Sequence, residues 1–250
     1  MISVIMSIVK LQNVTKVYGF GEATTLALDD VSLEVKKGEF VAIMGPSGSG
    51  KSTLMNIIGL LDHPTTGSYQ LSGEDVSTFK DRRLAHVRRD KIGFIFQSFN
   101  LLPRLNALEN VSLPLVYKTF DKIKRLNKAA KMLEGVDLKS RQYYMPSQLS
   151  GGQVQRVAVA RALVNNPSII LADEPTGNLD TVSSANIMKL LQEINDGGNT
   201  IIMITHNSEL AKYASRVVTV VDGRIDSDDA SEKTSKKPAK AKKSKKKDEQ

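Results

Sequence analysis

Cysteine is absent from the 250-residue sequence, and so is any apolar run of membrane-spanning length. Without cysteine the chain can form neither a disulfide bond nor a zinc site built on thiolates, which agrees with a reducing compartment. A helix needs roughly 20 consecutive apolar residues to cross a bilayer, and no stretch comes near this length. Hydrophobic residues still make up 40% of the chain, which is enough for a core. The length suits one large α/β domain or two small ones.

A basic surface is also missing from most of the chain, although the net charge is +8. Between Lys233 and Gln250, nine lysines against Asp248 and Glu249 give +7, which leaves +1 for the remaining residues. This balance argues against a nucleic-acid-binding surface. Residues 227–250 are too polar to bury a core, so we expect a disordered, lysine-rich tail. A plain solvated extension is one interpretation of this tail, and attraction to anionic lipid, worth roughly 1 kcal/mol per lysine, is another.

The stretch that organises the sequence is Gly45–Ser52, which fits the phosphate-binding template G-x-x-x-x-G-K-[ST]. An apolar run of strand length precedes it, and apolar residues at helical spacing follow it. The glycines let successive N–H groups face one concavity, and the start of the helix adds partial positive charge there. Lys51 can reach the β- and γ-phosphates of a nucleotide, and the Ser52 hydroxyl can ligate Mg²⁺. The residues predicted to bind the phosphates are Gly45, Pro46, Ser47, Gly48, Ser49, Gly50, Lys51, Ser52 and Thr53.

Helical and apolar strand-length segments alternate in the second half of the chain, which predicts an α/β fold with a mostly parallel sheet covered on both faces. The expected elements are a helix at Gly151–Val164, a strand at Ser168–Ala172, a helix at Ser183–Ile194, a strand at Thr200–Thr205, a helix at Ser208–Tyr213 and a strand at Arg216–Val221. Phosphate chemistry then belongs at the carboxyl ends of the strands.

The first half adds two further parts to this core. Early strands near Ile8–Val14 and Leu26–Val35 are expected to form a local antiparallel subdomain, with Val17–Gly19 in a turn. Between Gln97 and Ser150 no strand pattern occurs, while Ala107–Tyr117 and Asp121–Leu133 have helical patterns. A loop around Pro114–Phe120 is the alternative for the residues between them. We therefore predict an inserted α-helical subdomain at about 98–164, within a nucleotide-binding domain that spans 1–226.

Two acids, Asp173 and Glu174, follow an apolar run. By themselves they are equally compatible with an ordinary acidic turn. Together with the phosphate loop they favour a hydrolytic site. A buried strand would deliver Asp173 to the Mg²⁺ shell, and Glu174 would face the γ-phosphate and polarise a water.

Leu149–Gln153, with the sequence Leu-Ser-Gly-Gly-Gln, precedes a long helix. Its glycines offer N–H groups at a positive helix end, although Ser150 is also explained as a simple N-cap. The string resembles the signature of ATP-binding cassette (ABC) proteins. This resemblance implies a head-to-tail homodimer with two ATP molecules between the chains. It also implies that Ser150, Gly151, Gly152 and Gln153 contact the γ-phosphate of the ATP bound by the partner.

The resemblance assigns roles to further positions. It implies that Tyr18 stacks on adenine and that Gln97 senses nucleotide and passes movement to the helical subdomain. Asp180 would communicate across the dimer, and it could also cap the following helix. His206 would contact the γ-phosphate and hold the catalytic acid and its water, and Asn207 stands where many relatives carry Asp. The implied catalytic residues are Lys51, Glu174 and His206, and the implied Mg²⁺ ligands are Ser52, Gln97 and Asp173.

Within the family, Gly59–Gly67, Phe96–Pro103 and Glu109–Pro114 look most like the lipoprotein-release and macrolide-export (LolD/MacB-like) branch, with the cell-division cassette FtsE a near relative. The resemblance implies an ATPase subunit, peripheral on the cytoplasmic face of the membrane. It would drive a separate permease that exports or extracts a lipophilic or peptide-like substrate. The alternative is a mechanical ATPase that regulates cell-wall enzymes through a membrane partner. A cassette acting on DNA or ribosomes is disfavoured, because such relatives usually carry two cassettes or a long coiled coil.

The permease is expected to dock near Gln97 and on the helices between Asn100 and Leu133. Phe99, Leu101 and Leu102 are candidates for this contact, and they are equally compatible with the core of the helical subdomain.

Overall fold

The computed structural model describes residues 7–19, 23–119 and 121–230. The strands are β1 (Ser7–Tyr18), β2 (Thr25–Lys36), β3 (Phe40–Met44), β4 (Thr66–Leu71), β5 (Glu74–Asp75), β6 (Ile92–Phe96), β7 (Ile169–Asp173), β8 (Thr200–Ile204), β9 (Arg216–Val221) and β10 (Arg224–Ala230). The α-helices are α1 (Lys51–Ile58), α2 (Asp81–Lys91), α3 (Ala107–Ser112), α4 (Lys122–Glu134), α5 (Gly151–Leu163), α6 (Thr181–Asp196) and α7 (Ser208–Ala211). Short 3₁₀ helices cover Leu113–Tyr117, Lys139–Arg141 and Pro146–Gln148.

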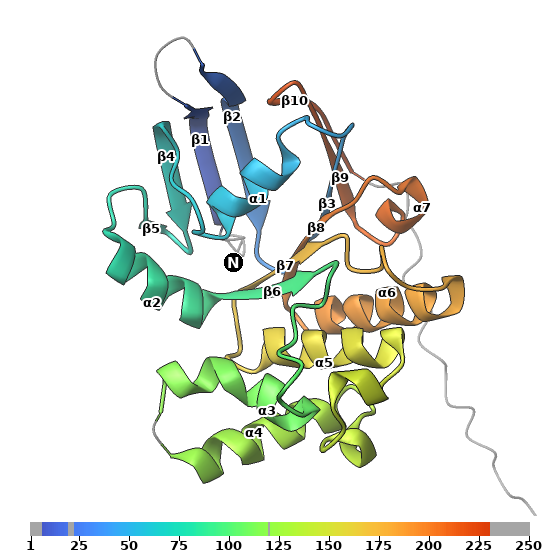
Figure 1. Cartoon of the computed structure of the whole chain (residues 1–250). Helices are drawn as coiled ribbons and strands as arrows, with labels where there is room; N and C mark the ends of the chain where they lie inside the picture. The colour runs from blue at the N-terminus through green and yellow to red at the C-terminus, as the bar shows by residue number, and fades with distance from the viewer. Residues whose placement is uncertain (1–6, 20–22, 120, 231–250) are drawn as a thin grey trace, which may run out of the picture.

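The strands form two sheets (Figure 1). The first has the order β2-β1-β4-β5 and is antiparallel. The second has the order β10-β9-β3-β8-β7-β6 and is parallel from β9 to β6, with β10 antiparallel to β9. The predicted fold class, a mostly parallel core sheet with an N-terminal antiparallel sheet, is confirmed. The parallel strands place their carboxyl ends, and the loops that follow them, along one edge.

Neighbouring residues of the central strands belong to different hydrophobic clusters. In β3, Val41 and Ile43 face the cluster that contains α1 and the antiparallel sheet, whereas Phe40 and Ala42 face the cluster that contains α3 to α6. The strands β7 and β8 alternate in the same way. Because successive side chains of a strand point to opposite faces, a strand buried on both faces is apolar throughout. This explains why the central strands were recognisable as continuous apolar runs.

The segment between β6 and β7 contains no strand among its described residues. The helices α3, α4 and α5 pack against one another, and α5 also packs on β6 (Figure 1). Asn106 and Glu109 form a capping box that starts α3. The predicted helical stretch Ala107–Tyr117 is divided in two: α3 ends at Ser112 and a 3₁₀ helix follows over Leu113–Tyr117. Pro114 lacks the N–H that a continuing α-helix would need.

Two further expectations are corrected by the strand boundaries. The turn predicted at Val17–Gly19 is wrong, because β1 continues through Tyr18, which pairs with Thr25. Residues 227–230, assigned from the sequence to the tail, belong to β10 and pair with β9. This strand lies at the edge of its sheet and is polar, so no apolar pattern revealed it; Arg216 holds it by pairing with Asp228. The rest of the lysine-rich tail lies outside the described residues.

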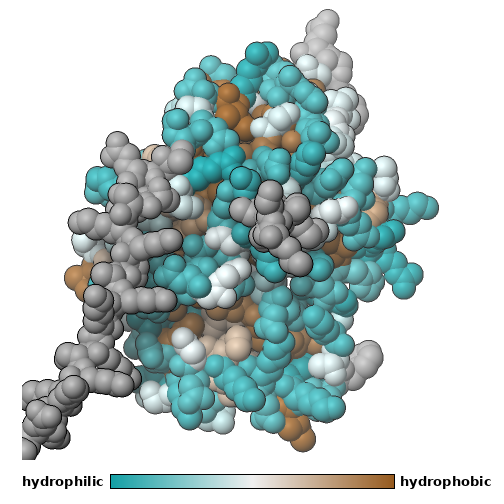
Figure 2. All heavy atoms as spheres, turned by 180° about the vertical axis from the view of Figure 1, so that it is seen from behind, coloured by the Kyte–Doolittle hydropathy of each residue, from teal (hydrophilic) through white to brown (hydrophobic). Residues whose placement is uncertain are grey.

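Among the described residues, no helix is both long enough and apolar enough to cross a membrane. Figure 2 shows the face turned away in Figure 1, which is largely hydrophilic with scattered hydrophobic patches. Among the exposed large apolar side chains are Tyr117, Ile123 and Tyr143 in or near the helical region between β6 and β7.

Candidate active site

The phosphate loop joins β3 to α1 and lies against the backbone of two other strands. Gly45 has a φ of +148°, and a Cβ there would lie 2.0 Å from the carbonyl oxygen of Val220. Gly50 has a φ of +99°, and a Cβ there would lie 2.5 Å from the carbonyl oxygen of Ala27. A side chain at either position would have to displace a strand. The loop therefore follows this path only with glycine at both positions.

The N-terminus of α1 lacks a side-chain cap. Its N-cap residue is Gly50, which offers no side-chain hydrogen bond to the first turn. The first N–H groups of a helix have no partner within the helix, and together with the helix dipole they attract anions. Lys51 Nζ donates to the carbonyl oxygens of Gly45 (2.8 Å) and Pro46 (2.6 Å), so its ammonium group lies over the loop. Uncapped N–H groups and a positive charge thus meet at one place.

The carboxyl ends of β7 and β8 lie side by side and carry the two acids. Asp173, the last residue of β7, is in register with Ile204, the last residue of β8. Glu174 has a φ of +43°, in the left-handed region that residues with a Cβ rarely adopt. Its N–H donates to the Ile204 carbonyl oxygen at 2.9 Å. This backbone turn directs the Glu174 side chain towards the residues that follow β8.

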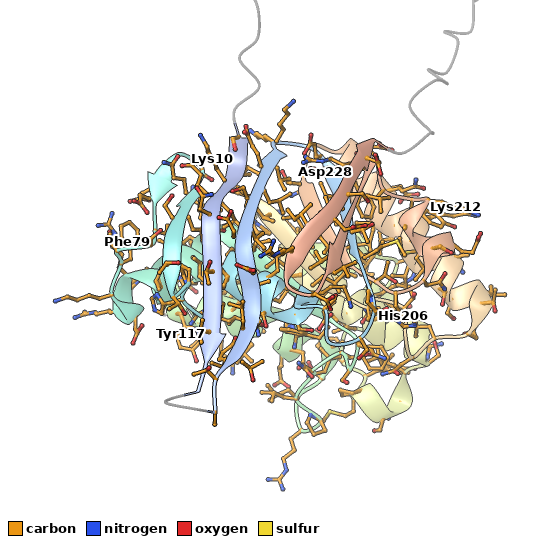
Figure 3. All side chains as sticks on the ribbon, turned by 90° about the horizontal axis from the view of Figure 1, so that it is seen from above. Lys10, Phe79, Tyr117, His206, Lys212 and Asp228 are labelled. Atoms are coloured by element: carbon orange, nitrogen blue, oxygen red, sulfur yellow. The ribbon has the colours of Figure 1, made fainter. Side chains whose placement is uncertain are left out.

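The Glu174 carboxylate is held at both oxygens. His206 contacts Oε1 twice, through its ring Nδ1 at 2.6 Å and its backbone N–H at 2.9 Å. Thr205 Oγ1 donates to Oε2 at 3.2 Å. The His206 side chain is 76% exposed and that of Glu174 only 15%, so the imidazole covers the carboxylate from the solvent side. Figure 3 shows His206 at one end of the strands, with Asp228 of β10 towards the other.

The Asp173 carboxyl connects the acids to the phosphate loop. Burial raises its pKa, the neighbouring Glu174 adds to the rise, and the Lys51 ammonium opposes it. A divalent cation beside Asp173 would favour the ionised form. The described residues hold no group of three His, Cys, Asp or Glu side chains that could bind a metal alone. A cation here would therefore need oxygens from the nucleotide, which is how Mg²⁺ is commonly bound in phosphate sites.

Gln97 lies beside the loop that follows Glu174. A Cβ on Gly177 would be 2.7 Å from Gln97 Nε2, so the glutamine side chain packs closely on that loop. Asn178 Nδ2 donates to the Gln97 carbonyl oxygen at 3.0 Å, although the two residues are 81 positions apart. The structure therefore brings the predicted coupling glutamine to the loop that ends at Asp180.

The signature segment and Asp180 form two neighbouring helix starts. Ser150 Oγ accepts from the Gln153 N–H, and the Gln153 side chain accepts from the Ser150 N–H, which makes a capping box at α5. Asp180 accepts from the N–H groups of Val182 and Ser183 and caps α6. Hydrogen bonds from Ser183 lower the pKa of the Asp180 carboxyl. The cap role foreseen for Asp180 is present, and its role across a dimer stays a prediction.

Tyr18 stands at the end of β1 with 40% of its surface exposed. Its hydroxyl donates to Asp62 Oδ2 at 2.7 Å. Partial burial and this hydrogen bond raise the pKa of the phenol, while a hydrogen bond with Thr53 opposes the rise. Because Thr53 lies in the first turn of α1, the Tyr18 ring stands beside the phosphate-binding helix.

Two buried polar residues of the site were not predicted from the sequence. Thr205 supports Glu174, and its sequence signal is a hydroxyl at the end of an apolar strand. Gln155 is fully buried in α5, and its Nε2 donates to the Pro175 carbonyl oxygen at 2.5 Å. It ties the signature helix to the residue after Glu174. A glutamine among buried valines and alanines is the signal that could have revealed it.

The remaining predictions concern the residues near Gln97. Leu101 packs against the hydrophobic cluster of the helical region, which supports the core interpretation for this residue. Leu102 is 46% exposed, which leaves it available for a contact. Phe99 is partly buried, and its carbonyl oxygen accepts from Arg161 at 2.8 Å. Asn207, the departure noted in the sequence, caps α7 by accepting from the Glu209 N–H.

A strand, a phosphate loop, an uncapped helix and a braced carboxylate at the next strand ends define a phosphate-loop ATPase. The sequence matches the ABC transporter family over residues 28–177. It is also 54% identical over 217 residues to the ABC transporter ATP-binding protein YknY of Bacillus subtilis, a protein described as uncharacterized; the match covers 87% of this chain and 94% of YknY. The chain therefore belongs to the ABC transporter ATP-binding family and is an ATPase.

Two other relatives are informative. The macrolide export ATP-binding/permease protein MacB of Bdellovibrio bacteriovorus is 49% identical over 225 residues, which cover 88% of this chain but 34% of MacB. A dimeric structure of the ATP-binding cassette MJ0796, bound to ADP and Pi after hydrolysis, is similar with a TM-score of 0.81 and 48% identity, covering 89% of this chain and 98% of that one. The predicted resemblance to this branch of the family is confirmed.

Proposed function

We propose that this ATPase is the nucleotide-binding subunit of an exporter and drives a separate membrane permease from the cytoplasmic face. The observation that carries the catalytic part is the Glu174 carboxylate, held by His206 and Thr205 at the edge where the phosphate loop lies. Export is favoured because the MacB relative, by its name, combines such a cassette with a macrolide export permease. A lipophilic or peptide-like substrate, exported or extracted from the membrane, fits this relationship.

In this proposal Lys51 and the N–H groups at the start of α1 bind the β- and γ-phosphates, and Glu174 orients the attacking water. Ser52, Gln97 and Asp173 would hold Mg²⁺ together with phosphate oxygens, because all three offer hard oxygen ligands. When bound, Mg²⁺ neutralises charge that develops on the phosphates. His206 keeps the Glu174 side chain in place and reaches towards the γ-phosphate.

A second copy of the chain completes the site. The MJ0796 cassette is described as dimeric, and this chain has a similar fold and a signature segment that caps its own helix. We infer a head-to-tail homodimer in which Ser150 to Gln153 of one protomer face the ATP bound by its partner. Asp180, at the neighbouring start of α6, would lie at the same interface.

The surface proposed for the permease is a groove of about 680 Å³ between α2, β6 and the helical region. Phe94, Phe96 and Leu113 contribute apolar surface to it, and Arg88 and Arg89 lie along it. The hydroxyphenyl group of Tyr117, 75% exposed, stands at its border. A short amphipathic segment of a membrane protein fits a groove that combines apolar and basic residues.

The catalytic proposal is tested by Glu174→Gln, which keeps the shape of the side chain but removes its charge. We expect hydrolysis to fall by about 100-fold or more with ATP affinity within about threefold, because the carboxylate acts on the water and not on binding. Glu193→Gln, on the exposed side of α6, is the matched control. Hydrolysis by Glu174→Gln at the parent rate would refute the proposed role.

The docking proposal is tested with single cysteines, since the chain contains none of its own. A photo-crosslinker on Ala85→Cys, which lines the groove, should yield an adduct with a membrane-spanning protein in native membranes. The same probe on Lys189→Cys of α6 should not. Equal adducts from both positions would contradict docking in the groove. An adduct whose partner regulates cell-wall enzymes, and moves no substrate, would replace export by the mechanical alternative.

The lysine-rich tail lies outside the described residues, and its contact with anionic lipid is a separate proposal that rests on its charge alone. Removal of residues 231–250 should weaken binding to vesicles with anionic headgroups at low salt. Unchanged vesicle binding would eliminate this contact.

A further inference from the structure

A compact polar cluster surrounds the hydroxyl of Tyr18. Asp62 accepts from the Tyr18 hydroxyl through Oδ2 at 2.7 Å and from Lys16 Nζ through Oδ1 at 2.6 Å. The His63 N–H also donates to Oδ1 at 2.7 Å, and Lys16 donates to the His63 carbonyl oxygen at 2.8 Å. Both ionic side chains are well covered, with exposed fractions of 12% for Lys16 and 27% for Asp62. The cluster joins the end of β1 to the loop after α1.

This cluster also fixes the orientation of the Tyr18 ring. Lys16 Nζ lies 4.8 Å from the ring centroid, over one face of the ring, while the Tyr18 side chain remains exposed overall. The phenol therefore has its oxygen held by Asp62 and one of its faces covered by a cation. Although partial burial opposes it, hydrogen bonds from Lys16 and Tyr18 lower the pKa of the Asp62 carboxyl. Asp62 is thus an ionised acceptor, and bonds to a charged acceptor are among the stronger ones.

We propose that Asp62 and Lys16 are positioning residues for the nucleotide base, because they hold the Tyr18 ring beside the first turn of α1. This inference rests on the proposed adenine contact of Tyr18. A ring fixed before binding loses no rotational freedom when a base stacks on it, so the cluster raises affinity for the adenine moiety. It does not act on the phosphates, which lie at the other end of the nucleotide.

A cluster that merely joined β1 to the following loop would behave differently. It would lower the unfolding temperature when broken, and it would leave the affinity ratio between ATP and a ligand without a base unchanged. Inorganic tripolyphosphate is the suitable probe, since it can occupy the phosphate loop but offers nothing to Tyr18. The ratio of the two dissociation constants therefore isolates the contribution of the base.

The experiment measures ATP and tripolyphosphate affinity, KM and kcat for the full chain and its variants. Asp62→Ala and Tyr18→Phe should each raise the Kd and KM for ATP by about 3- to 10-fold, in line with the cost of ordering one side chain on binding. The tripolyphosphate Kd and kcat should not change. The double variant should raise the Kd by less than the product of the two single effects, because both substitutions remove the Tyr18–Asp62 hydrogen bond. Asp81→Ala is the control, since the Asp81 side chain is 97% exposed and contacts the His63 ring, not Asp62 or Tyr18, among the described ion pairs.

Two outcomes distinguish the positioning role of Asp62 from the proposed adenine contact of Tyr18. If Tyr18→Ala weakens ATP binding while Asp62→Ala and Tyr18→Phe do not, the base contact stands and the positioning role is overturned. If Tyr18→Ala leaves ATP affinity unchanged, the proposed adenine contact itself fails. Should Asp62→Ala not fold, Tyr18→Phe still tests the Tyr18–Asp62 hydrogen bond, because it removes only the hydroxyl of a partly exposed ring.

Discussion

The N-termini of α1 and α5 are both proposed to face nucleotide phosphate, yet they are built differently. Helix α1 follows Gly50, which provides no cap, and Lys51 lies over the loop in front of it. Helix α5 follows Ser150, which forms a reciprocal box with Gln153. One of the hydrogen bonds in this box, from the Gln153 N–H to Ser150 Oγ, is long at 3.4 Å. The N-terminus of α1 therefore has no side-chain cap, whereas that of α5 is capped by its own side chains.

This difference separates a site that one chain forms from a site that needs two. At α1 the helix end has no side-chain cap, and an anion bound there would take the Lys51 ammonium group from the loop carbonyl oxygens that it contacts. At α5 the capping box pairs the N–H groups of Ser150 and Gln153 in the absence of ligand, and its long bond costs little to exchange for a phosphate oxygen. We therefore expect α1 to govern ATP binding by the monomer and α5 to govern hydrolysis by the dimer.

The largest effect should come from Lys51→Met, which removes the charge at the α1 end. We expect ATP affinity to fall by about 10- to 100-fold in the monomer, as for the loss of a charge-assisted bond to phosphate, and hydrolysis to disappear. Titration calorimetry measures this effect. Lys131→Met on the exposed side of α4 serves as the control. If Lys51→Met bound ATP with the affinity of the parent, the α1 end would not govern ATP binding by the monomer.

The α5 end is tested by Ser150→Asp, because aspartate caps helices as well as serine does. The unfolding temperature should stay within about 2 °C, and monomeric ATP binding should not change. Hydrolysis should fall by about 10-fold or more, since a negative charge would face the partner's γ-phosphate. Ser150→Ala gives the opposite pattern, with a lower unfolding temperature and a smaller loss of hydrolysis. Full activity of Ser150→Asp would remove α5 from the site.

An intermediate effect is expected at Gln155, which links α5 to the loop after Glu174. Gln155→Leu should lower kcat by about 3- to 10-fold with little change in KM, because we expect the link to position the proposed catalytic carboxylate of Glu174 without contacting ATP. The change leaves the Pro175 carbonyl without its partner, so some loss of stability accompanies it. A rise in KM without any change in kcat would show that Gln155 acts on binding instead.

The smallest effect concerns the stability of the nucleotide-free chain. The pKa of Asp173 is raised in the folded protein, so at pH 7 its ionised form is disfavoured by folding. Asp173→Asn should therefore raise the unfolding temperature at pH 7 by a few degrees at most. The gain should shrink as the pH falls towards about 3.9, the ordinary pKa of aspartate, where the parent also carries a proton. A thermal unfolding series over pH measures this, and a loss of stability at pH 7 would contradict it.

Local patterns allowed much of this molecule to be predicted. The strand Arg216–Val221 was placed with its observed bounds and the strand Thr200–Thr205 to within one residue, because buried parallel strands are apolar throughout. The prediction failed for β10, whose edge position permits polar residues. The helical pattern over Ala107–Tyr117 did not show where α-helix gives way to 3₁₀ helix beside Pro114. In both segments the observed structure depends on burial and strand pairing, which are properties of the whole fold.

The sequence alone determined the phosphate loop, the paired acids and the signature segment, because each is a short string whose function depends on neighbouring residues. Only the tertiary structure decided which distant side chains brace them. Thr205 and His206 reach Glu174 because parallel strands end together, Asp62 reaches Tyr18 because α1 brings the chain back to β1, and Gln155 reaches Pro175 because α5 packs beneath the catalytic loop. Such contacts depend on strand register and packing, and no local spacing records them.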